Sequence, residues 1–478
     1  MIDQKMSCFV AGGRMAGAGV GVSSVQPGSS VGYTVACASD EQVAAAVSSA
    51  RRAFEITRRA SAHERANWLN GAAEALQRDS ERIAQVVSED IGKPIRLAAA
   101  EVRRGEGFLR ACASAISNLG SEVLPVDAAA GGAGRFGFTR RVPFGVVAAV
   151  TPFNAPVNLL LQKLAPAVAA GNAVVVKPAP AGNRTALAIA ELFSEAGWPI
   201  GLFNVVAGDH APALALVANP GVNVVSFTGG EEAGKALFQA AGLKKFVAEL
   251  GSNAANVVMP DADIANAASK ITAAAFEASG QQCVSAQRIL VHRAIFEPFL
   301  SAFVAAARVL KVGPANDPAT DVGPMVSEAA ARRVMSMCED AIARGARYAL
   351  EPVQNGCLVS PGILEEVSSD ALMWRSEAFG PIALVRPFDS TNEAISLAND
   401  SPYGLQGALF TNSLDIVMRF SAEFDVGSLW INEASRFRLD MYPFGGMKRS
   451  GIGREGIRYA IEELSNLKFI GINPKIGG

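Results

Sequence analysis

Short apolar runs alternate with longer amphipathic stretches through the second quarter of the chain. Residues 146–150, 173–176 and 203–206 are runs rich in Val, and each has the length of a buried strand. Between these runs the apolar residues recur at helical spacing, and the two stretches end at Gly171 and Gly197, where a helix can close. This alternation predicts βαβ units on a parallel sheet, whose ligands bind at the carboxyl ends of the strands.

The alternation extends well beyond this first series. Further strands are predicted at residues 222–227 and 246–250. A second alternating series begins near residue 256 and continues past residue 430. We therefore expect two α/β domains, with a boundary near residue 251.

Helical spacing also dominates residues 40–118, ahead of the first series. The pattern predicts a helix capped by Asp40, a second helical run that follows Ser61 and a third that begins near Lys93. A long Ala-rich run at residues 263–279 is predicted to be helical as well. These helices would cover the faces of the two sheets.

Two segments alternate in the manner of exposed strands. Residues 135–141 follow a stretch containing proline and several glycines, and they alternate like one strand of a ribbon. Residues 467–472 at the far end of the chain also read as a strand. We expect the two segments to pair with each other.

Composition narrows the range of partners. The chain has 478 residues, half of them hydrophobic, and a net charge of −2 without a basic stripe, so we expect neither nucleic acid nor a membrane surface as a partner. The N-terminus lacks the pattern of a signal peptide, and the longest apolar runs are too short to span a bilayer. Six cysteines without a C-x-x-C pair indicate no metal site, no disulfide scaffold and a reducing cytoplasm.

One cysteine stands out by its setting. Cys283 lies between Gly280 and a strand predicted at residues 289–291, directly after the Ala-rich helical run. A thiol at such a helix-to-loop junction can face a cleft and act as a nucleophile, whereas a buried thiol would only fill space. None of the three histidines lies in a motif, so a different group would have to activate Cys283.

Polar residues follow three of the predicted strands. Asn154 lies between Pro152 and Pro156, and its amide is a candidate oxyanion donor or an ordinary turn residue. Lys177 is a candidate for a ribose or phosphate contact, or a solvated surface lysine. Glu249 is a candidate general base, or an ion-pairing carboxylate.

Two glycine patterns require caution. Residues 229–236 nearly match a phosphate-binding P-loop, but Ala236 replaces the required Ser or Thr, so ATP chemistry is not expected. The strand that ends at Thr228 still opens into a helix, whose first N–H groups can receive a pyrophosphate. Residues 451–456 match G-x-G-x-x-G but follow a loop, so they are not expected to be a dinucleotide fingerprint.

Taken together, these segments resemble the aldehyde dehydrogenase superfamily. The resemblance extends over residues 8–472 and rests on motifs in the family's order and at close to its spacing, at residues 151–156, 177–178, 227–229, 249–251, 280–283, 377–381 and 443–456. It implies an α/β fold with a Rossmann-like parallel-sheet cofactor domain, an α/β catalytic domain and a small β-ribbon oligomerisation element. The implied divisions are 1–120 with 143–251, then 252–452, and finally 121–142 with 453–478.

The resemblance also implies a reaction, the oxidation of an aldehyde to a carboxylic acid with NAD(P) through a cysteine thioester. Cys283 would attack the carbonyl, Asn154 would hold the alkoxide and Glu249 would activate water. The remaining implied cofactor contacts are Thr151, Phe153, Lys177, Pro180, Phe227, Thr228, Gly229, Leu250, Glu377 and Phe379, and no metal is expected. The ribbon would give a homodimer or homotetramer.

Departures from the family pattern affect the details. Pro180 stands where many NAD-preferring relatives have a glutamate that binds the 2′-hydroxyl, so we expect NAD with NADP possible. Asn466 replaces a second glutamate, so a proton relay through that position is not expected. Arg104 and Arg438 could bind an anionic end of the substrate, or Arg438 could pair with a carboxylate such as Asp440 or Glu433.

Two alternative functions remain at this point. In a CoA-acylating relative, CoA would replace water as the acyl acceptor, but the presence of Glu249 argues against that branch. A non-catalytic protein on the same fold would not need the full set of expected functional residues, all of which are present.

Overall fold

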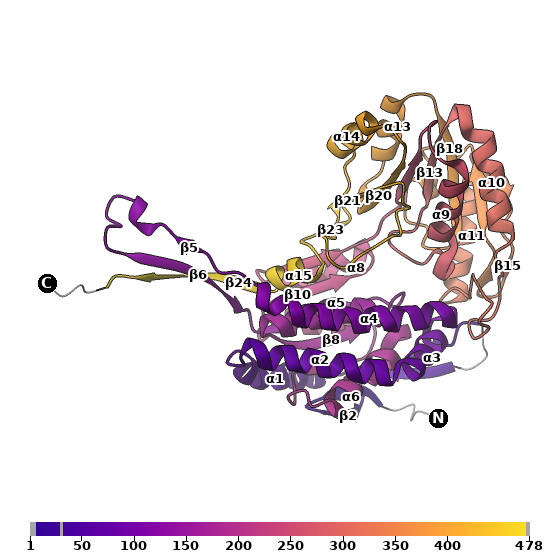
Figure 1. The fold of residues 1–478 in the computed structure, drawn as a ribbon. Helices are drawn as coiled ribbons and strands as arrows, with labels where there is room; N and C mark the ends of the chain where they lie inside the picture. Colours follow the sequence, from indigo (N-terminus) through magenta and orange to yellow (C-terminus); the bar gives the residue numbers. More distant parts are fainter. Residues whose placement is uncertain (1–5, 29–31, 475–478) are drawn as a thin grey trace.

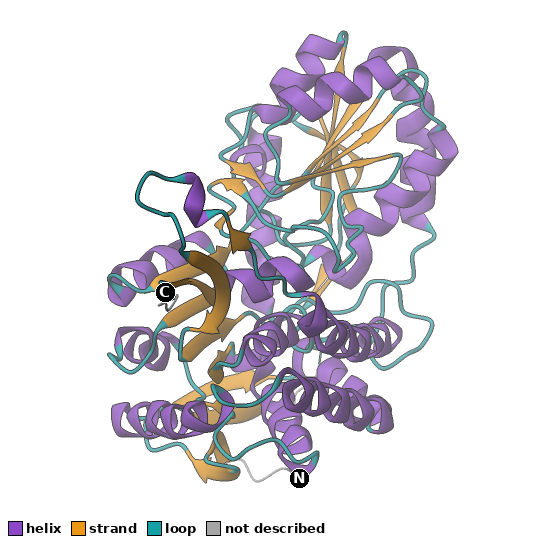
Figure 2. Cartoon of the chain, turned by 60° about the vertical axis from the view of Figure 1, so that its left-hand side comes forward, coloured by secondary structure: helices purple, strands orange, loops and turns teal. Residues whose placement is uncertain are grey.

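The structure is a computed structural model that describes residues 6–28 and 32–474. Two α/β lobes lie one above the other, and a thin β-arm projects from the lower lobe (Figure 1). Each lobe has a central sheet with helices on both faces (Figure 2). The predicted α/β fold is confirmed.

The first sheet has eight strands, and its centre is parallel. Both edges are antiparallel additions, formed by β1 with β2 on one side and by β23 on the other. In spatial order the strands are β2 (Gly13–Ala16), β1 (Met6–Val10), β9 (Phe203–Val205), β8 (Ala173–Pro178), β7 (Val146–Thr151), β10 (Val224–Thr228), β11 (Lys245–Glu249) and β23 (Gly451–Ile452).

Strand order reverses between β7 and β10, because the chain moves outward through β8 and β9 before it returns to β10. The carboxyl ends of β7 and β10 therefore flank a crevice, the usual position of a ligand in such sheets. Helices α1, α7 and α8 pack against the sheet and contact one another in sequence order. Helices α5 and α6 also pack against the sheet, and α2, α3 and α4 pack against α5 and α6. Their bounds are α1 (Asp40–Thr57), α2 (Ala62–Arg78), α3 (Ser80–Ile91), α4 (Ile95–Ala115), α5 (Asn158–Ala170), α6 (Asn183–Glu195), α7 (His210–Ala218) and α8 (Glu231–Ala241).

The second sheet has seven strands, all in parallel pairs except β14 with β17. Separate apolar cores lie on its two faces, one with α9 and α10, the other with α11, α13 and α14. The strands are β14 (Arg347–Leu350), β17 (Gly362–Glu365), β18 (Ile382–Phe388), β13 (Arg288–His292), β12 (Ala255–Val258), β20 (Gln406–Phe410) and β21 (Ser428–Ile431). The helices are α9 (Ile264–Phe276), α10 (Phe296–Arg308), α11 (Glu328–Ala343), α12 (Leu372–Arg375), α13 (Thr391–Asn399) and α14 (Leu414–Glu423).

The arm is a three-stranded antiparallel sheet in the order β24, β6, β5. Its strands β24 (Ser465–Ile472) and β6 (Phe136–Pro143) pair along their whole length, and β5 (Val123–Leu124) adds at the edge. The predicted pairing of the C-terminal strand with the ribbon is confirmed. The remaining elements are β3 (Gly21–Val25), β4 (Gly32–Ala36), β15 (Gln354–Asn355), β16 (Leu358–Val359), β19 (Tyr403–Gly404), β22 (Met447–Lys448), α15 (Ile457–Glu463), η1 (Ile116–Asn118), η2 (Val126–Ala128), η3 (Pro180–Gly182), η4 (Glu277–Gly280) and η5 (Arg293–Ile295).

The end of the chain returns to the first lobe before it enters the arm. Strand β23 pairs with β11, and α15 packs on α5 and α4. The glycine pattern at residues 451–456 thus forms an edge strand and the turn that follows it, in agreement with its exclusion as a dinucleotide fingerprint. The division into domains stays a prediction, and the edge strand places residues 451–452 beside the first sheet.

Three local predictions are wrong in detail. Ser39, not Asp40, caps α1, and it does so in a capping box with Gln42. The run that follows Ser61 is divided at Asp79, so residues 40–118 hold four helices where three runs were expected. The helix predicted to extend to residue 279 ends at Phe276. Across the described residues, no helix has both the length and the apolar character needed to cross a membrane.

Candidate active site

The loop that carries Cys283 begins with an unusual backbone turn. Ala278, Ser279 and Gly280 all have left-handed φ angles, of 50°, 57° and 65°. A side chain on Gly280 would place its Cβ 2.1 Å from the carbonyl oxygen of Gly380, so only glycine fits there. Strain of this kind persists where the surrounding structure enforces it, and it commonly occurs at functional sites. The turn ends the helix early and leads the chain to Cys283, which is partly exposed.

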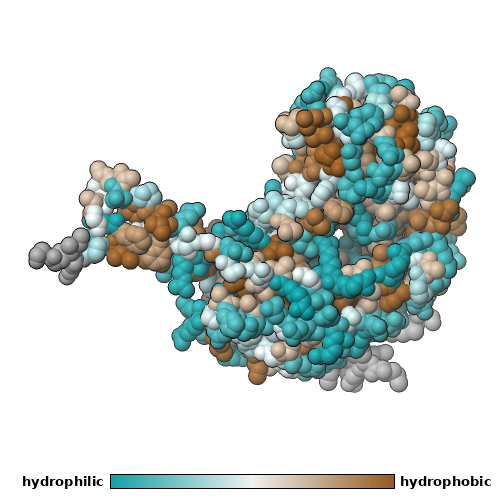
Figure 3. Space-filling view, in the orientation of Figure 1, coloured by the Kyte–Doolittle hydropathy of each residue, from teal (hydrophilic) through white to brown (hydrophobic). Residues whose placement is uncertain are grey.

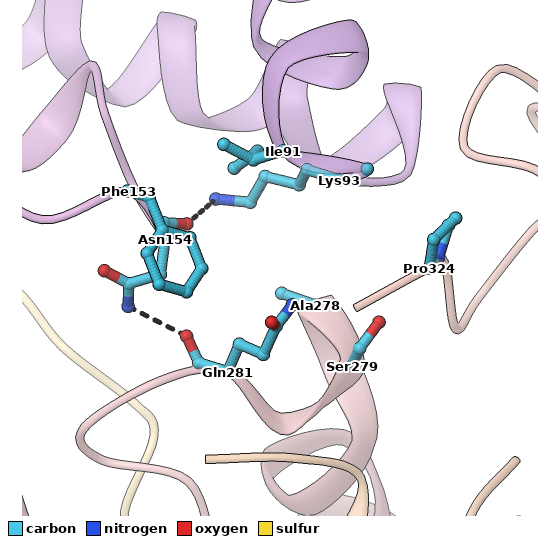
Figure 4. Close-up of a pocket in the computed structure, with 9 residues that line it drawn as sticks. Ile91, Lys93, Phe153, Asn154, Ala278, Ser279, Gln281 and Pro324 are labelled. Carbon is cyan, nitrogen blue, oxygen red and sulfur yellow. Dashed lines mark hydrogen bonds between the residues drawn. The ribbon is translucent and has the colours of Figure 1, made fainter. Parts of the chain in front are cut away.

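Asn154 reaches this loop from the other lobe. It follows β7, its side chain is buried, and its Nδ2 donates a hydrogen bond of 2.8 Å to the carbonyl oxygen of Gln281 (Figure 4). An amide nitrogen carries two hydrogens, so one N–H remains for a second acceptor. The structure therefore brings together the loops of Asn154 and Cys283, as predicted from sequence.

Glu249 is the last residue of β11 and is 2% exposed. Neither of its carboxyl oxygens has a hydrogen-bond partner among the described residues. Burial first, and then the neighbouring Glu455, raise the pKa of Glu249 well above its ordinary value, against the opposing charges of Arg438, Lys163 and Arg454. An unpartnered buried carboxyl requires an explanation, and a site for a water or a substrate supplies one.

A buried charge cluster lies beside Glu249. Glu455 accepts hydrogen bonds from Lys163 Nζ and from Arg438, each at 3.0 Å. Burial opposes the ionisation of Glu455, yet Lys163 and then Arg438 lower its pKa below the ordinary value. The guanidinium of Arg438 also stacks 3.6 Å from the centre of the Phe444 ring. Arg438 is thus held by Glu455 and Phe444. The alternative of a structural ion pair is confirmed, but its partner is Glu455 and not Asp440 or Glu433.

The thiol of Cys283 is protonated at neutral pH in this environment. Burial first, and then Glu377, raise the pKa of Cys283 to about 12, while Arg438 acts in the opposite direction. A thiol is a weak nucleophile compared with the thiolate. Attack on a carbonyl therefore requires a base that removes the proton, and among the described neighbours Glu249 is a carboxyl with free oxygens.

The crevice between β7 and β10 offers a seat for a pyrophosphate. The hydroxyl of Thr228 at the end of β10 is buried and unpartnered, and α8 begins at Glu231 without a side-chain cap. The first-turn N–H groups of α8 have no carbonyl of their own helix to bond. The prediction that the Gly229 N–H faces a pyrophosphate is wrong, since this group donates to the carbonyl oxygen of Glu249 at 3.1 Å.

The far end of this crevice carries Lys177 at the end of β8 and Pro180 in the following 3-10 turn. Burial lowers the pKa of Lys177 to about 8, opposed by Asp209 and Cys37. Asp209, which caps α7, was not singled out from the sequence. Asp209 thus supplies a negative charge near Lys177, whereas Pro180, at the position where many NAD-preferring relatives have a glutamate, supplies none.

The remaining predicted cofactor contacts lie where the lobes meet. Phe153 and Phe379 pack edge to face, with ring centres 5.9 Å apart. Glu377 accepts a hydrogen bond of 3.1 Å from the Ser252 N–H, and burial raises the pKa of Glu377 to about 7. A Cβ on Gly251 would stand 2.8 Å from this carboxylate. Elsewhere in the first lobe, Thr151 is the last residue of β7 and Phe227 belongs to the apolar core, and the Leu250 N–H donates to the Ser450 carbonyl.

Arg436, which the sequence reasoning missed, contacts the residue before Cys283. Arg436 donates to the side chain of Gln282 at 3.0 Å and pairs with Glu277 at 2.6 Å. Arg104 forms a bidentate pair with Asp440 and adds to the positive charge felt by Arg436. Arg438 is committed to Glu455 and Phe444, whereas the side chains of Arg104 and Arg436 are partly exposed. Arg436 lies in no motif that pointed to it from the sequence.

Fold and site together define a class, the oxidoreductases that bind a dinucleotide at the carboxyl ends of a parallel sheet. Residues 19–470 match the profile of the aldehyde dehydrogenase family. The chain belongs to this family, and it is an NAD(P)-dependent enzyme that oxidises an aldehyde to a carboxylic acid.

Individual relatives show how much is shared. The chain is 41% identical to the 3-sulfolactaldehyde dehydrogenase of Priestia aryabhattai over 440 aligned residues, and this alignment covers 92% of each chain. It is 37% identical over 411 residues to aspartate-semialdehyde dehydrogenase 1 of Pseudomonas canavaninivorans, with 86% and 87% covered. The NADP complex of NADP-dependent glyceraldehyde-3-phosphate dehydrogenase from Bacillus halodurans C-125 superposes with a TM-score of 0.95 at 31% identity, over 98% and 99% of the chains.

Proposed function

We propose that Cys283 is the nucleophile, that Asn154 and the Cys283 N–H stabilise the oxyanion, and that Glu249 is the general base. The observation that carries these roles is the Asn154 amide hydrogen-bonded to Gln281, two residues before the thiol. It supports an oxyanion position beside the sulfur, because the second amide hydrogen stays available there. The carboxyl oxygens of Glu249 have no hydrogen-bond partner among the described residues, which supports its role as the general base.

The proposed steps follow from these groups. Glu249 takes the proton of Cys283, and the thiolate attacks the aldehyde carbonyl carbon to give an alkoxide that Asn154 holds. Loss of hydride from this carbon leaves a thioester on Cys283; NAD(P) held in the crevice would supply the hydride acceptor. Glu249 releases the proton it took from Cys283 to solvent, and it then takes a proton from water as the water attacks the thioester. The Cys283 thiolate is expelled and regains a proton from Glu249 as the acid is released.

The residues of the crevice fit the cofactor. The unpartnered Thr228 hydroxyl and the uncapped start of α8 suit a pyrophosphate, and Glu377 suits ribose hydroxyls. Asp209 near Lys177 disfavours a second phosphate there, which supports a preference for NAD. The absence of a carboxylate at Pro180 keeps NADP in use as a second cofactor.

Steady-state assays with an aldehyde panel, run with NAD and NADP in parallel and with or without CoA, test the reaction. We expect NADH formation without CoA, and its loss in Cys283→Ala while NAD binding persists. Strict dependence on CoA would favour the acylating alternative, and no reduced cofactor with any aldehyde would favour a non-catalytic role. Substantial turnover by the Cys283→Ala variant would remove the nucleophile assignment.

The substrate is proposed to be a short aldehyde with an anionic end. Arg436 touches Gln282, the residue before the nucleophile, and Arg104 lies close enough to act on it electrostatically. Both guanidinium groups are partly exposed, with Arg436 at 30% and Arg104 at 35% of the side chain. Two such groups can bind a carboxylate, sulfonate or phosphate. The names of the three relatives, which specify sulfolactaldehyde, aspartate semialdehyde and a phosphorylated aldehyde, support this class.

Replacement of Arg436 tests the anionic class. We expect Arg436→Gln to lower kcat/KM for succinate semialdehyde by about 10- to 100-fold and to leave propanal within about twofold. Arg419→Gln, which removes an exposed partner of Glu423 far from Gln282, is the matched control. Equal losses for both aldehydes would show that Arg436 has no part in anion recognition.

We also propose that the arm joins subunits into a homodimer or homotetramer. Val123, Leu467 and Phe469 on its strands are 68%, 58% and 52% exposed, and the space-filling view shows an apolar patch on the arm (Figure 3). All six cysteines are free thiols, which supports a reducing cytoplasm as the compartment. A monomer on size-exclusion chromatography with light scattering would contradict the role of the arm.

A further inference from the structure

Lys93 lies directly behind the proposed oxyanion amide. Its Nζ donates a hydrogen bond of 3.1 Å to the main-chain carbonyl oxygen of Asn154 (Figure 4). It also donates a hydrogen bond of 2.5 Å to the carboxylate of Glu101. Asn154 is therefore held from two sides, by Lys93 at its backbone and by the Gln281 carbonyl at its side chain. We infer that Lys93 is a positioning residue for the oxyanion amide, an inference that rests on the proposed role of Asn154.

Glu101 extends this contact to the helix that follows Asn154. One carboxylate oxygen binds Lys93, and the other accepts the N–H groups of Val157 and Asn158, at 2.8 and 3.1 Å. These amides open α5, whose start has no cap from its own side chains. A carboxylate is favoured at that end of a helix by the free N–H groups and by the helix dipole. Lys93 and Glu101 thus fix both ends of residues 154–158.

The position of Lys93 is set by contacts between the two lobes. Gly92 has φ +72°, and a Cβ there would stand 3.0 Å from the Pro324 carbonyl oxygen. The neighbouring Gly323 carbonyl accepts the Ser279 hydroxyl, in the strained turn before the nucleophile. The Val326 N–H donates to the Gln281 side chain at 3.0 Å. The Lys93 loop and the nucleophile loop therefore rest on the same segment of the second lobe.

A functional consequence follows from the geometry of an amide donor. The peptide that carries the Asn154 carbonyl would be free to rotate without the Lys93 contact, because its carbonyl would have no fixed charged donor. Rotation of this peptide would change the direction of the Asn154 side chain at the sulfur. A misplacement of about 1 Å in such a site can cost about 100-fold in rate.

The test removes the ammonium without leaving a buried charge behind. In Lys93→Met/Glu101→Gln the contact with Asn154 is lost, but the glutamine oxygen still accepts the Val157 and Asn158 amides. We expect the pre-steady-state burst of NADH to slow by about 10- to 100-fold, with the Kd for NAD within about twofold and Tm nearly unchanged. Lys93→Arg, which retains a charged donor, should recover part of the rate.

A double-mutant cycle separates positioning from a general effect on structure. In an Asn154→Ala background the same two substitutions should cause no further loss, because the group they position is absent. Arg96→Gln is the matched control. Arg96 lies in the first turn of α4, the helix that carries Glu101, and it forms an exposed ion pair with Asp321 at 3.0 Å. This control should leave the burst unchanged.

Each outcome decides the inference. An unchanged burst in Lys93→Met/Glu101→Gln, or an equal loss in the Asn154→Ala background, would overturn it. If Lys93→Met/Glu101→Gln does not fold, Lys93→Gln/Glu101→Gln takes its place in both backgrounds. Its two amide side chains retain a neutral contact with each other. A full burst in Asn154→Ala alone would instead contradict the proposed role of Asn154, whatever the result at Lys93.

Discussion

Two buried lysine–glutamate pairs lie around the candidate site, and they differ in what they hold. Lys93 and Glu101 bind main-chain groups around Asn154. Lys163 and Glu455 instead join Arg438 in a cluster beside the free carboxyl of Glu249. In the proposed mechanism the first pair fixes the direction of the Asn154 donor, whereas the second sets the charge around Glu249. On this proposal the same residue types serve geometry in one place and proton affinity in another.

The largest expected effect comes from the base itself. Glu249→Gln should lower steady-state turnover by about 10²- to 10⁴-fold, because no carboxylate remains to activate water. The NADH burst should slow as well, because Glu249 also takes the proton of Cys283, whereas the Kd for NAD should stay constant. Rapid-mixing fluorescence separates the two phases. Turnover at the wild-type rate would remove Glu249 from the mechanism and would leave the second pair without a function at the site.

The two pairs should also differ in their effect on stability. Lys93→Met leaves Glu101 without its lysine and should lower the free energy of unfolding by about 3–5 kcal/mol, since a buried charge loses its partner. Lys163→Met should cost less, because Glu455 keeps its hydrogen bond from Arg438. Thermal unfolding of both variants, with Lys93→Met/Glu101→Gln as the neutralised control, measures the difference. A larger loss at Lys163 would reverse this ranking.

Arg438 sharpens the comparison through pH. Deacylation requires the Glu249 carboxylate, whose pKa is raised in the folded protein, so its rate should increase as pH rises. Arg438→Met removes a charge that lowers this pKa, so the rising limb should move to higher pH and the rate at pH 7 should fall about tenfold. Arg438→Lys, which keeps a positive charge, should shift the profile less. A profile of kcat that does not move in Arg438→Met would show that the cluster does not act on Glu249.

The smallest effect is expected at Glu377, a carboxyl with no lysine pair. Its pKa of about 7 means that it becomes ionised as pH rises through neutrality, and an ionised carboxylate accepts ribose hydroxyls better. The Kd for NAD should therefore decrease about fivefold between pH 6 and pH 8, and Glu377→Gln should abolish this dependence. Glu366→Gln, at an exposed pair with Arg347, serves as the control. A wild-type Kd independent of pH would contradict this role of Glu377.

Local patterns were enough to predict the architecture and the strand ends at which the candidate site residues lie. Alternating runs gave β7, β8, β10 and β11 in parallel order, and the carboxyl ends of these strands placed Lys177 and Glu249 at one edge. The pairing of the C-terminal strand with the ribbon was also correct. Each of these features depends on periodicity and on a turn residue close in sequence.

The incorrect predictions concern contacts between residues that are far apart in the sequence. The helix before Cys283 ends at Phe276 and is followed by a left-handed turn in which Gly280 packs against the backbone of Gly380, one hundred residues away in sequence. Gly229 turned out to donate to Glu249, since parallel pairing of β10 with β11 occupies its N–H. No local signal at either glycine records such a contact.

By itself, the sequence determined the family and most of the order of strands and helices, and it selected the thiol, the amide and the carboxyl that we propose as catalytic groups. Only the tertiary structure decided which charge faces which group, as with Arg438 bound to Glu455 and Lys93 bound to the Asn154 carbonyl. The physical reason is the distance along the sequence between the residues that interact. Helices and strands are specified by neighbours a few residues apart, whereas buried charges find partners that the fold delivers from distant segments.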